Sequence, residues 1–304
     1  MKLTRTLFTL TLSFAIFAQE KNATAQIDLH SKNDQLLAVN YVTPNTSCSS
    51  AETKSNVEND CPELSITLKN GKNVYGIIST PHSAGKHGVA IVSHGFNGTH
   101  QFGKDYFKTL NALGYAVYTF DFPCGSIYSR SDSNTMNMSV TDEKETLKEI
   151  VAYFRKQTDV DKRKIVLIGE SQGGLVSALA ASELKSKVSN LVLIYPALCI
   201  PDNWNERYPR EEDIPEVSEI WGVKLGKKYM MDIRPMKPFE IIGNYKGNVL
   251  IVHGTDDKVV PLDYSKRAQK SYKHATLKII EKAGHGFNPE QRVLSNQFVR
   301  DFLK

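Results

Sequence analysis

The sequence lacks a strong excess of charge of either sign. Its 304 residues include 38 lysines and arginines and 33 aspartates and glutamates, which gives a formal net charge of +5. The basic residues are scattered along the chain among acidic ones, a pattern typical of solvated helix faces and not of a nucleic-acid footprint. We therefore expect no nucleic-acid partner.

Long hydrophobic runs are also missing. The apolar stretch near the N-terminus, residues 7–18, is shorter than the roughly 20 residues that a membrane-spanning helix needs. Lys2 and Arg5 precede it, and small residues follow at 23–25, so the sequence predicts a cleavable signal peptide over residues 1–25 and a secreted or periplasmic protein. An uncleaved anchor is the alternative. We expect no stable membrane insertion.

Cysteine is scarce, with four residues in the chain. The spacing of cysteines and histidines resembles no zinc site, so no metal is predicted. Export would permit disulfides, and Cys48 and Cys61 flank a polar segment that a bridge would close; an unbridged pair is the alternative. Cys124 and Cys199 each follow a predicted strand, and they are either free thiols or a second bridge.

The sequence contains no internal repeat or low-complexity tract, and its length suits one large domain. Residues 26–62 are polar and are interpreted as an N-terminal extension. Residues 63–304 alternate between short apolar runs and amphipathic segments, which predicts an α/β domain with a mostly parallel sheet flanked by helices. An interruption at about 200–240, rich in aromatic residues and proline, indicates a small cap insertion.

The expected elements of this domain start with an antiparallel hairpin, residues 64–68 and 74–79, around the turn signal Asn70-Gly71. Buried strands are then expected at 89–93, 115–120, 164–168, 191–195, 249–252 and 276–280. Helices are expected at 105–113, 139–157, 175–184, 262–273 and from about 289 onward. In sheets of this kind the functional groups gather at the carboxyl ends of the strands.

The hexapeptide GESQGG, residues 169–174, follows one of these strands and precedes an apolar helix. It has the pattern of a nucleophile elbow, in which a serine lies on a tight turn from strand to helix. Gly169 and Gly173 flank Ser171 at the two positions where a Cβ atom would not fit. Ser171 is therefore the predicted nucleophile.

A serine hydroxyl is a weak nucleophile at neutral pH, so it needs a base that an acid holds in the right tautomer. Two aspartates, Asp256 and Asp257, follow the predicted strand 249–252, and the segment KAGHGF presents His285 between two glycines. The order serine, aspartate, histidine is the one expected for a fold with this elbow. The backbone amide of Gln172, the residue after the nucleophile, is predicted to donate a hydrogen bond to the oxyanion.

At these positions the chain resembles the α/β-hydrolase family, and within it the small esterases of the cinnamoyl (feruloyl) ester and acylglycerol type. The resemblance covers about residues 64–304. It rests on four motifs in the expected order: SHGFNG (93–98), GESQGG (169–174), HGTDDKVVP (253–261) and GHGF (284–287).

The resemblance assigns further roles. It implies that Asp257 is the catalytic acid, with Asp256 as the second choice, and that the backbone amide of Phe96 is the second oxyanion donor. His94 and His253 are interpreted as structural histidines at strand ends.

The chain departs from the family after the strand at 115–120. Many relatives carry D-x-x-G-H-G-x-S at this point, whereas this sequence reads DFPCGSIYSRSD at 121–132, without the histidine. The predicted triad is unaffected by the change. The shape of the substrate pocket is not carried over from the family.

The resemblance and the predicted export imply a secreted serine carboxylic-ester hydrolase that forms an acyl-enzyme and needs no cofactor. The expected substrates are hydroxycinnamoyl (feruloyl) or acetyl esters of plant polysaccharide fragments, so the partner is a small-molecule or oligosaccharide ester. An acylglycerol lipase or general carboxylesterase is the alternative, followed by a serine exopeptidase or a non-catalytic binding module. Trp204 and Trp221 either cover an acyl group or pack the cap onto the domain. The sequence leaves the oligomeric state open.

Overall fold

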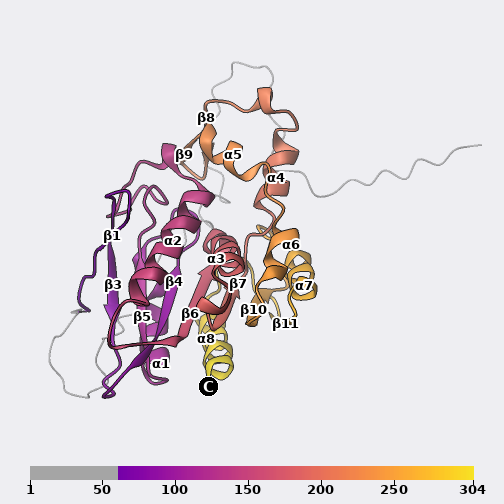
Figure 1. Ribbon diagram of the computed structural model, residues 1–304. Helices are drawn as coiled ribbons and strands as arrows, with labels where there is room; N and C mark the ends of the chain where they lie inside the picture. Colours follow the sequence, from indigo (N-terminus) through magenta and orange to yellow (C-terminus); the bar gives the residue numbers. More distant parts are fainter. Residues whose placement is uncertain (1–60) are drawn as a thin grey trace, which may run out of the picture. The chain divides into compact units, whose positions relative to one another are not determined.

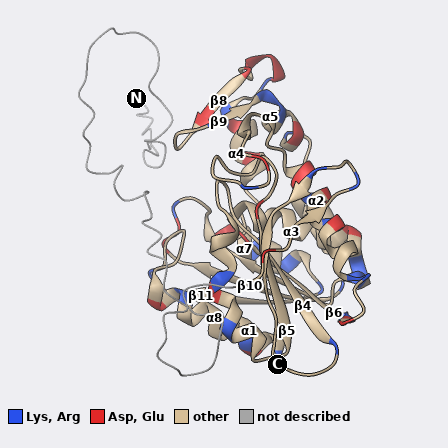
Figure 2. Cartoon of the chain, turned by 90° about the vertical axis from the view of Figure 1, so that its left-hand side faces the viewer, with Lys and Arg blue, Asp and Glu red and all other residues tan. Residues whose placement is uncertain are grey.

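The computed structural model describes residues 61–304 (Figure 1). The predicted signal peptide at 1–25 lies outside the described residues, as does the predicted extension except for its last two positions. Basic and acidic residues are interspersed along the described helices (Figure 2). No helix within residues 61–304 combines the length and the apolar character needed to span a membrane.

The cysteines fall into two groups. Cys61 is disulfide-bonded, and Cys48, the partner considered for it, lies outside the described residues. Cys124 and Cys199 are buried free thiols. Of the two alternatives for this second pair, the structure therefore has the free thiols.

Seven strands form the central sheet, in the order β11-β10-β7-β6-β4-β5-β3. Neighbouring strands are parallel except for β3, which pairs antiparallel with β5. The strands are β3 (Gly76–Ser79), β4 (His87–Ser93), β5 (Tyr115–Phe120), β6 (Val160–Glu170), β7 (Asn190–Ile194), β10 (Asn248–Gly254) and β11 (His274–Ile280). The predicted mostly parallel sheet is confirmed.

Helices cover both faces of this sheet (Figure 1). They are α1 (Phe107–Asn111), α2 (Val140–Phe154), α3 (Ser171–Leu184), α7 (Leu262–Ser271) and α8 (Pro289–Leu303). Leu147 of α2 and Leu175 of α3 belong to one buried cluster, and Leu110 of α1 and Val299 of α8 belong to the other. Short 3-10 helices complete the connections: η2 (His100–Tyr106), η3 (Thr135–Asn137), η4 (Lys185–Lys187), η5 (Glu211–Asp213) and η6 (Ile242–Asn244).

The inner strands are apolar throughout because both of their faces are covered. In β4, Val89 and Ile91 face the cluster that includes α2 and α3, while Ala90 and Val92 face the cluster that includes α1 and α8. Parallel strands between two helical layers have no solvated side, so they appear in the sequence as continuous apolar runs. Full burial of one valine or isoleucine side chain contributes about 1.5–3 kcal/mol.

The N-terminal hairpin is present but shorter than predicted. Its strands, β1 (Ile66–Thr67) and β2 (Asn73–Val74), form a separate two-stranded antiparallel sheet. The expected second strand at 74–79 is interrupted at Tyr75, whose amide donates a hydrogen bond to Ser131 Oγ at 2.8 Å. The chain then leaves the hairpin and enters the central sheet as β3.

Between β7 and β10 the chain forms the insertion, residues 200–241. It contains helices α4 (Ile200–Arg207), α5 (Lys227–Ile233) and α6 (Pro238–Ile241) and an antiparallel hairpin of β8 (Val217–Ile220) and β9 (Val223–Gly226). Asp232 of α5 accepts hydrogen bonds from Ser139 Oγ at 2.9 Å and from the Thr141 amide at 2.8 Å, at the start of α2. The insertion is thereby fastened above the carboxyl ends of the strands (Figure 1).

Candidate active site

Ser171 lies at the junction of β6 and α3, with φ of +48°. This left-handed conformation is costly for a residue other than glycine and is found where the surrounding structure enforces it. A Cβ atom on Gly169 would lie 2.2 Å from the Gly173 carbonyl oxygen, and one on Gly173 would lie 2.4 Å from the carbonyl oxygens of Ser93 and His94. Glycine alone fits at both positions. The turn is a nucleophile elbow in its backbone geometry.

The three side chains predicted as a triad meet at this turn. His285 Nε2 lies 3.0 Å from Ser171 Oγ, although the two residues are 114 positions apart. His285 Nδ1 lies 2.8 Å from Asp257 Oδ2. Asp256 is engaged elsewhere, because its Oδ1 accepts a hydrogen bond from Thr255 Oγ1 at 3.0 Å. Of the two candidate acids, the structure therefore brings Asp257 to the histidine.

The carboxylate of Asp257 is held as an anion. Its side chain is fully buried, and its Oδ1 accepts hydrogen bonds from the amides of Val259 at 2.9 Å and Val260 at 2.8 Å. Burial alone would raise the pKa of Asp257, but hydrogen bonds from His253, His285 and the Val260 amide hold that pKa well below its usual range. An anion in this position keeps the proton of His285 on Nδ1, which leaves Nε2 able to accept the proton of Ser171.

His253 is a contact of the acid that the sequence analysis did not identify. Its Nε2 lies 3.3 Å from Asp257 Oδ2 and 2.9 Å from the Val260 carbonyl oxygen, and its Nδ1 lies 2.6 Å from Ser265 Oγ. A carbonyl oxygen can only accept a hydrogen bond, so His253 Nε2 carries a proton. This N–H group also faces the Asp257 carboxylate. In the sequence, the spacing of four residues between His253 and Asp257 was the feature that could have indicated this contact.

His94 has a structural role, as the sequence analysis expected. Its Nε2 accepts a hydrogen bond from the Phe122 amide at 3.0 Å, so its Nδ1 donates to the Gly95 carbonyl oxygen at 2.7 Å. Burial lowers the pKa of His94 and keeps the ring neutral. The ring connects the loop after β4 to the end of β5.

The two predicted oxyanion donors belong to residues near the nucleophile, and Gln172 follows Ser171 directly in the chain. A Cβ atom on Gly95 would lie 3.1 Å from Ser171 Cβ, so the loop that carries Phe96 passes close to the serine. For the amides of Phe96 and Gln172, no acceptor is found among residues 61–304. Both N–H groups are therefore available to a bound oxygen, which is the arrangement that an oxyanion hole requires.

Asn97 ties this loop to the segment after β5. Its φ is +56°, and its amide donates to the Gly125 carbonyl oxygen at 3.1 Å. Its Oδ1 accepts hydrogen bonds from Ser126 Oγ at 3.1 Å and from the Ile127 amide at 3.0 Å. These bonds hold the residue after Phe96 to the backbone of Gly125 and Ile127 and to the hydroxyl of Ser126.

The side chain of Gln172 links three elements. Its Nε2 donates to the two carboxyl oxygens of Glu143 in α2 at 3.0 and 2.9 Å, and its Oε1 accepts from Tyr229 OH in α5 at 2.7 Å. Burial, with a smaller contribution from the negative charges of Asp232 and Asp142, raises the pKa of Glu143 to about 8. The residue whose amide is a predicted oxyanion donor is thus anchored both to the main domain and to the insertion.

The segment that departs from the family pattern folds around its serines. Ser129 Oγ accepts hydrogen bonds from the amides of Ser131 at 3.1 Å and Asp132 at 3.2 Å, and it donates to the Phe122 carbonyl oxygen at 3.1 Å. Ser131 Oγ donates to the Asp121 carbonyl oxygen at 2.7 Å. Hydroxyl groups therefore hold this loop in place of the missing histidine and glycines.

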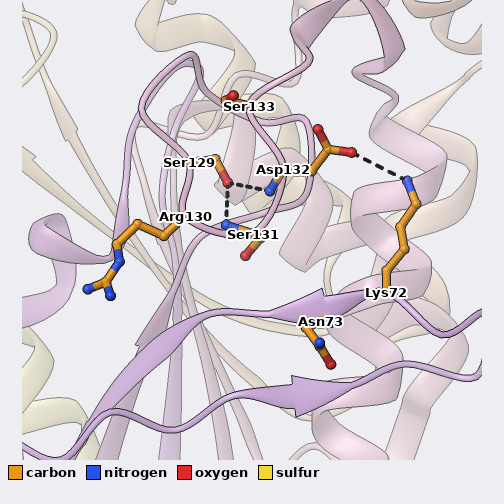
Figure 3. Close-up of a pocket in the computed structure, with 7 residues that line it drawn as sticks. All are labelled: Lys72, Asn73, Ser129, Arg130, Ser131, Asp132 and Ser133. Carbon is orange, nitrogen blue, oxygen red and sulfur yellow. Dashed lines mark hydrogen bonds and ion pairs between the residues drawn. The ribbon is translucent and has the colours of Figure 1, made fainter.

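A polar depression of about 450 Å³ lies beside this loop (Figure 3). Among the residues that the structure describes, Lys72, Asn73 and residues 129–133 line it. Lys72 forms an ion pair with Asp132 at 3.9 Å, and the hydroxyls of Ser129 and Ser131 are used by the backbone. These walls place no base beside a hydroxyl, so the depression is not the candidate site for nucleophilic chemistry.

The two tryptophans of the insertion have different environments. Trp204 is buried, with its ring 5.9 Å from both Tyr208 and Tyr229. Trp221, at the turn between β8 and β9, is 62% exposed, and its ring lies 5.8 Å from that of Phe96 in an edge-to-face arrangement. Trp204 therefore packs the insertion, whereas Trp221 presents an aromatic surface next to the loop that carries Phe96.

Comparison with known proteins agrees with this geometry. A family model described as serine aminopeptidase, S33, matches residues 84–232. The structure is also similar to that of Est1E from Butyrivibrio proteoclasticus with bound ferulic acid, with a TM-score of 0.72 and 25% identity, over 79% of this chain and 97% of that one. The chain is an α/β-hydrolase.

Two further proteins are similar to this hydrolase. The monoacylglycerol lipase of Paleococcus ferrophilus shares its fold with a TM-score of 0.58 and 18% identity, over 76% of this chain and 98% of the lipase. Methylesterase 7 of Arabidopsis thaliana is 26% identical over 154 residues, which is 43% of this chain. The match spans 55% of the length of the methylesterase. Esterases and lipases thus recur among the proteins that the hydrolase resembles.

Proposed function

We propose that this hydrolase is an exported serine esterase that cleaves hydroxycinnamoyl (feruloyl) or acetyl esters of plant polysaccharide fragments through an acyl-enzyme. The observation that carries the proposal is the position of His285, with Nε2 3.0 Å from Ser171 Oγ and Nδ1 2.8 Å from Asp257 Oδ2. A hydroxyl, an imidazole and a buried carboxylate in this order form the charge arrangement that acyl transfer needs.

In the first half of the reaction, His285 Nε2 takes the proton of Ser171 as Oγ attacks the ester carbonyl carbon. The carbonyl oxygen becomes negative and accepts hydrogen bonds from the amides of Phe96 and Gln172. Loss of one such donor costs about 3 kcal/mol of barrier in enzymes where it has been measured. His285 then gives its proton to the alcohol oxygen, the bond from the carbonyl carbon to that oxygen breaks, and the acyl group stays on Ser171.

In the second half, water replaces the alcohol. His285 takes a proton from the water as its oxygen attacks the acyl carbon, and the same two amides receive the oxyanion. When the bond to Ser171 Oγ breaks, His285 returns the proton to the serine and the carboxylic acid leaves. The anion of Asp257 stabilises the imidazolium in both halves.

The exposed ring of Trp221 supports an aromatic acyl group as the substrate. It lies edge-to-face against Phe96, whose amide is a proposed oxyanion donor, and we infer that an acyl group bound to Ser171 contacts this pair of rings. Aromatic pairs of this kind contribute about 0.5–1.5 kcal/mol beyond the area that they bury. The ferulic acid bound to Est1E is the chemical precedent among the similar structures.

A panel of esters with the Ser171→Ala variant as control tests the proposal. We expect turnover of methyl ferulate, methyl coumarate or acetylated xylan fragments, and none by the variant. Cleavage of p-nitrophenyl esters alone would leave a serine esterase and reject the substrate assignment. Preferential cleavage of monoacylglycerols or of aminoacyl anilides would replace it with a lipase or an aminopeptidase. Inactivity on the whole panel, without labelling by a fluorophosphonate, would reject the proposal entirely.

Export is tested separately. The full-length chain, produced with its own N-terminus in a bacterial host, is expected to appear in the periplasm or the medium with Gln26 as its first residue. Mass spectrometry of the intact protein measures this. A protein that keeps Met1 and stays in the cytoplasm would contradict export and leave the chemistry unaffected.

A further inference from the structure

We infer that Tyr195 is a positioning residue whose ring holds the imidazole of His285 against Ser171. The ring centroids of Tyr195 and His285 lie 4.7 Å apart, with an angle of 56° between their planes. Tyr195 is 3% exposed, so this contact is internal. The inference rests on the proposed function of the Ser171 site, and it assigns a role to a residue outside the triad and the oxyanion loop.

The place of Tyr195 in the sheet explains how it reaches the histidine. It follows the last residue of β7, the strand that lies between β6 and β10. Its amide donates to the Val252 carbonyl oxygen of β10 at 2.7 Å, and the amide of Ala197 donates to the Ser171 carbonyl oxygen at 2.9 Å. The segment is therefore fastened on one side to the strand that precedes Asp257 and on the other to the nucleophile.

The ring of Tyr195 is fixed at both of its ends. At the backbone its φ is +34°, a conformation that a tyrosine keeps only where its surroundings enforce it. At the other end its hydroxyl donates to Glu170 Oε2 at 2.6 Å, and the ring of Phe287 packs at a right angle to it with the centroids 4.8 Å apart. These contacts keep the ring of Tyr195 in place beside the imidazole of His285.

Glu170 anchors the hydroxyl from a buried polar cluster. Arg292, Asp105 and Tyr106 face the same small cavity as Glu170, and burial raises the pKa of Glu170 to about 8. Arg292 belongs to α8 and donates to the Phe287 carbonyl oxygen at 2.9 Å. The loop that carries His285 is thus connected to Glu170, the residue before the nucleophile, through the rings of Phe287 and Tyr195.

The imidazole of His285 therefore contacts Ser171 and Asp257 through its two nitrogens, and it also packs against the ring of Tyr195. The contacts with Asp257 and Ser171 set which ring nitrogen of His285 carries the proton, but neither prevents the imidazole from tilting away from Ser171. Tyr195 does so, and its aromatic ring also lies within the distance at which an imidazolium is stabilised. Loss of the ring should lower the rate of the chemical step and leave substrate binding unchanged, because a small displacement of a catalytic group is costly.

The test compares Tyr195→Leu and Tyr195→Phe with Tyr245→Leu. Tyr245 is a matched control because it is also buried and donates through its hydroxyl to a backbone carbonyl, that of Val188 at 3.3 Å. We expect Tyr195→Leu to lower kcat about 10- to 100-fold with KM within about twofold, and Tyr195→Phe to restore most of the rate. Tyr245→Leu should leave kcat and KM within about twofold of the wild type.

Wild-type kcat in a folded Tyr195→Leu variant would overturn the inference. If that variant fails to fold, Tyr195→Met decides, because it also lacks the ring, and wild-type kcat in it would overturn the inference equally. Failure of the proposed function has a different signature, in which the wild-type protein neither reacts with a fluorophosphonate nor cleaves any ester. NMR contacts between the His285 ring and Ser171 would still decide in that case, because contacts unchanged between the wild type and Tyr195→Leu reject the Tyr195 ring as a positioning device.

Discussion

Two regions of the hydrolase meet at Ser171 and are held in place by different means. The triad region comprises the turns that carry Ser171, Asp257 and His285. Here the backbone sets the geometry, because Gly169 and Gly173 lie against carbonyl oxygens and two backbone amides donate hydrogen bonds to the Asp257 carboxylate. In the recognition region, which comprises loop 121–133 and the insertion, the side chains of Ser129, Asp232 and Tyr229 form the hydrogen bonds that hold the segments in place. The first arrangement constrains which residues are tolerated, and the second allows the pocket to vary.

The difference has a functional consequence. Changes in the triad region should abolish turnover of every ester, because each ester passes through the same proton transfer. Changes in the recognition region should alter stability or the preference among esters and leave the chemical step in place. The following variants test this division.

The largest effect is expected for Ser171→Ala, which removes the nucleophile. We expect kcat/KM to fall by about 10⁴- to 10⁶-fold on any ester that the wild type cleaves, measured under single-turnover conditions. Ser182→Ala, on the same helix, is the control, because its hydroxyl only donates to the Leu179 carbonyl oxygen at 2.7 Å. More than a hundredth of the activity remaining in Ser171→Ala would place the chemistry elsewhere.

Asp257→Asn should follow, compared with Asp256→Asn. An amide at position 257 would favour the wrong tautomer of His285 and could not stabilise the imidazolium, so kcat should fall by about 10³- to 10⁴-fold. Asp256→Asn should stay within about threefold of the wild type, because its carboxylate is bonded to Thr255. The opposite ranking in steady-state kinetics would show that the wrong acid has been assigned.

Glu143→Gln tests the recognition region through the pH dependence of stability. The pKa of Glu143 is raised to about 8 by burial, so between pH 4.5 and 8 the folded protein keeps a proton that the unfolded chain releases. Stability from this group is therefore complete at low pH and is lost as the pH rises, by at most about 1.4 kcal/mol per pH unit.

Urea unfolding at pH 5, 6.5 and 8 measures this loss. The fall in the free energy of unfolding should be shallower in Glu143→Gln, which keeps an acceptor for Gln172. Glu170 contributes a fall of the same sign in both proteins, because burial also raises its pKa to about 8. Parallel curves for the wild type and the variant would show that Glu143 is not protonated in the folded state.

The smallest effect is expected for Trp221→Ala. Loss of the exposed ring next to Phe96 should raise KM for methyl ferulate about 10-fold and change kcat little. Turnover of p-nitrophenyl acetate, whose acyl group is too small to reach the ring, is the internal control. Equal losses on both substrates would assign Trp221 to the stability of the insertion.

The sequence predicted most of the sheet and the residues that meet at Ser171, because both leave local marks. Continuous apolar runs mark strands covered on both faces, and the glycines around Ser171 mark a turn that leaves no room for a Cβ atom. The contact of Gln172 with Glu143 and Tyr229 joins residues 29 and 57 positions apart without a motif. It arises from packing between helices and so could not be predicted from local sequence.

The same reason explains two smaller differences. The break in the predicted strand 74–79 depends on the hydroxyl of Ser131, a residue 56 positions away that bonds to the amide of Tyr75. The contact between Tyr195 and His285 depends on the order of β7 in the sheet and on a positive φ at an ordinary tyrosine. Neither the order of strands nor the positive φ is marked by the residues around them.

The most direct test of the account is the position and rate of covalent labelling. Wild-type protein and His285→Ala are treated with a fluorophosphonate, digested and analysed by mass spectrometry over time. The account predicts one adduct, on the peptide that contains Ser171, and a labelling rate at least about 10³-fold lower in His285→Ala. An adduct on another residue, or equal rates in the two proteins, would contradict the claim that His285 activates Ser171.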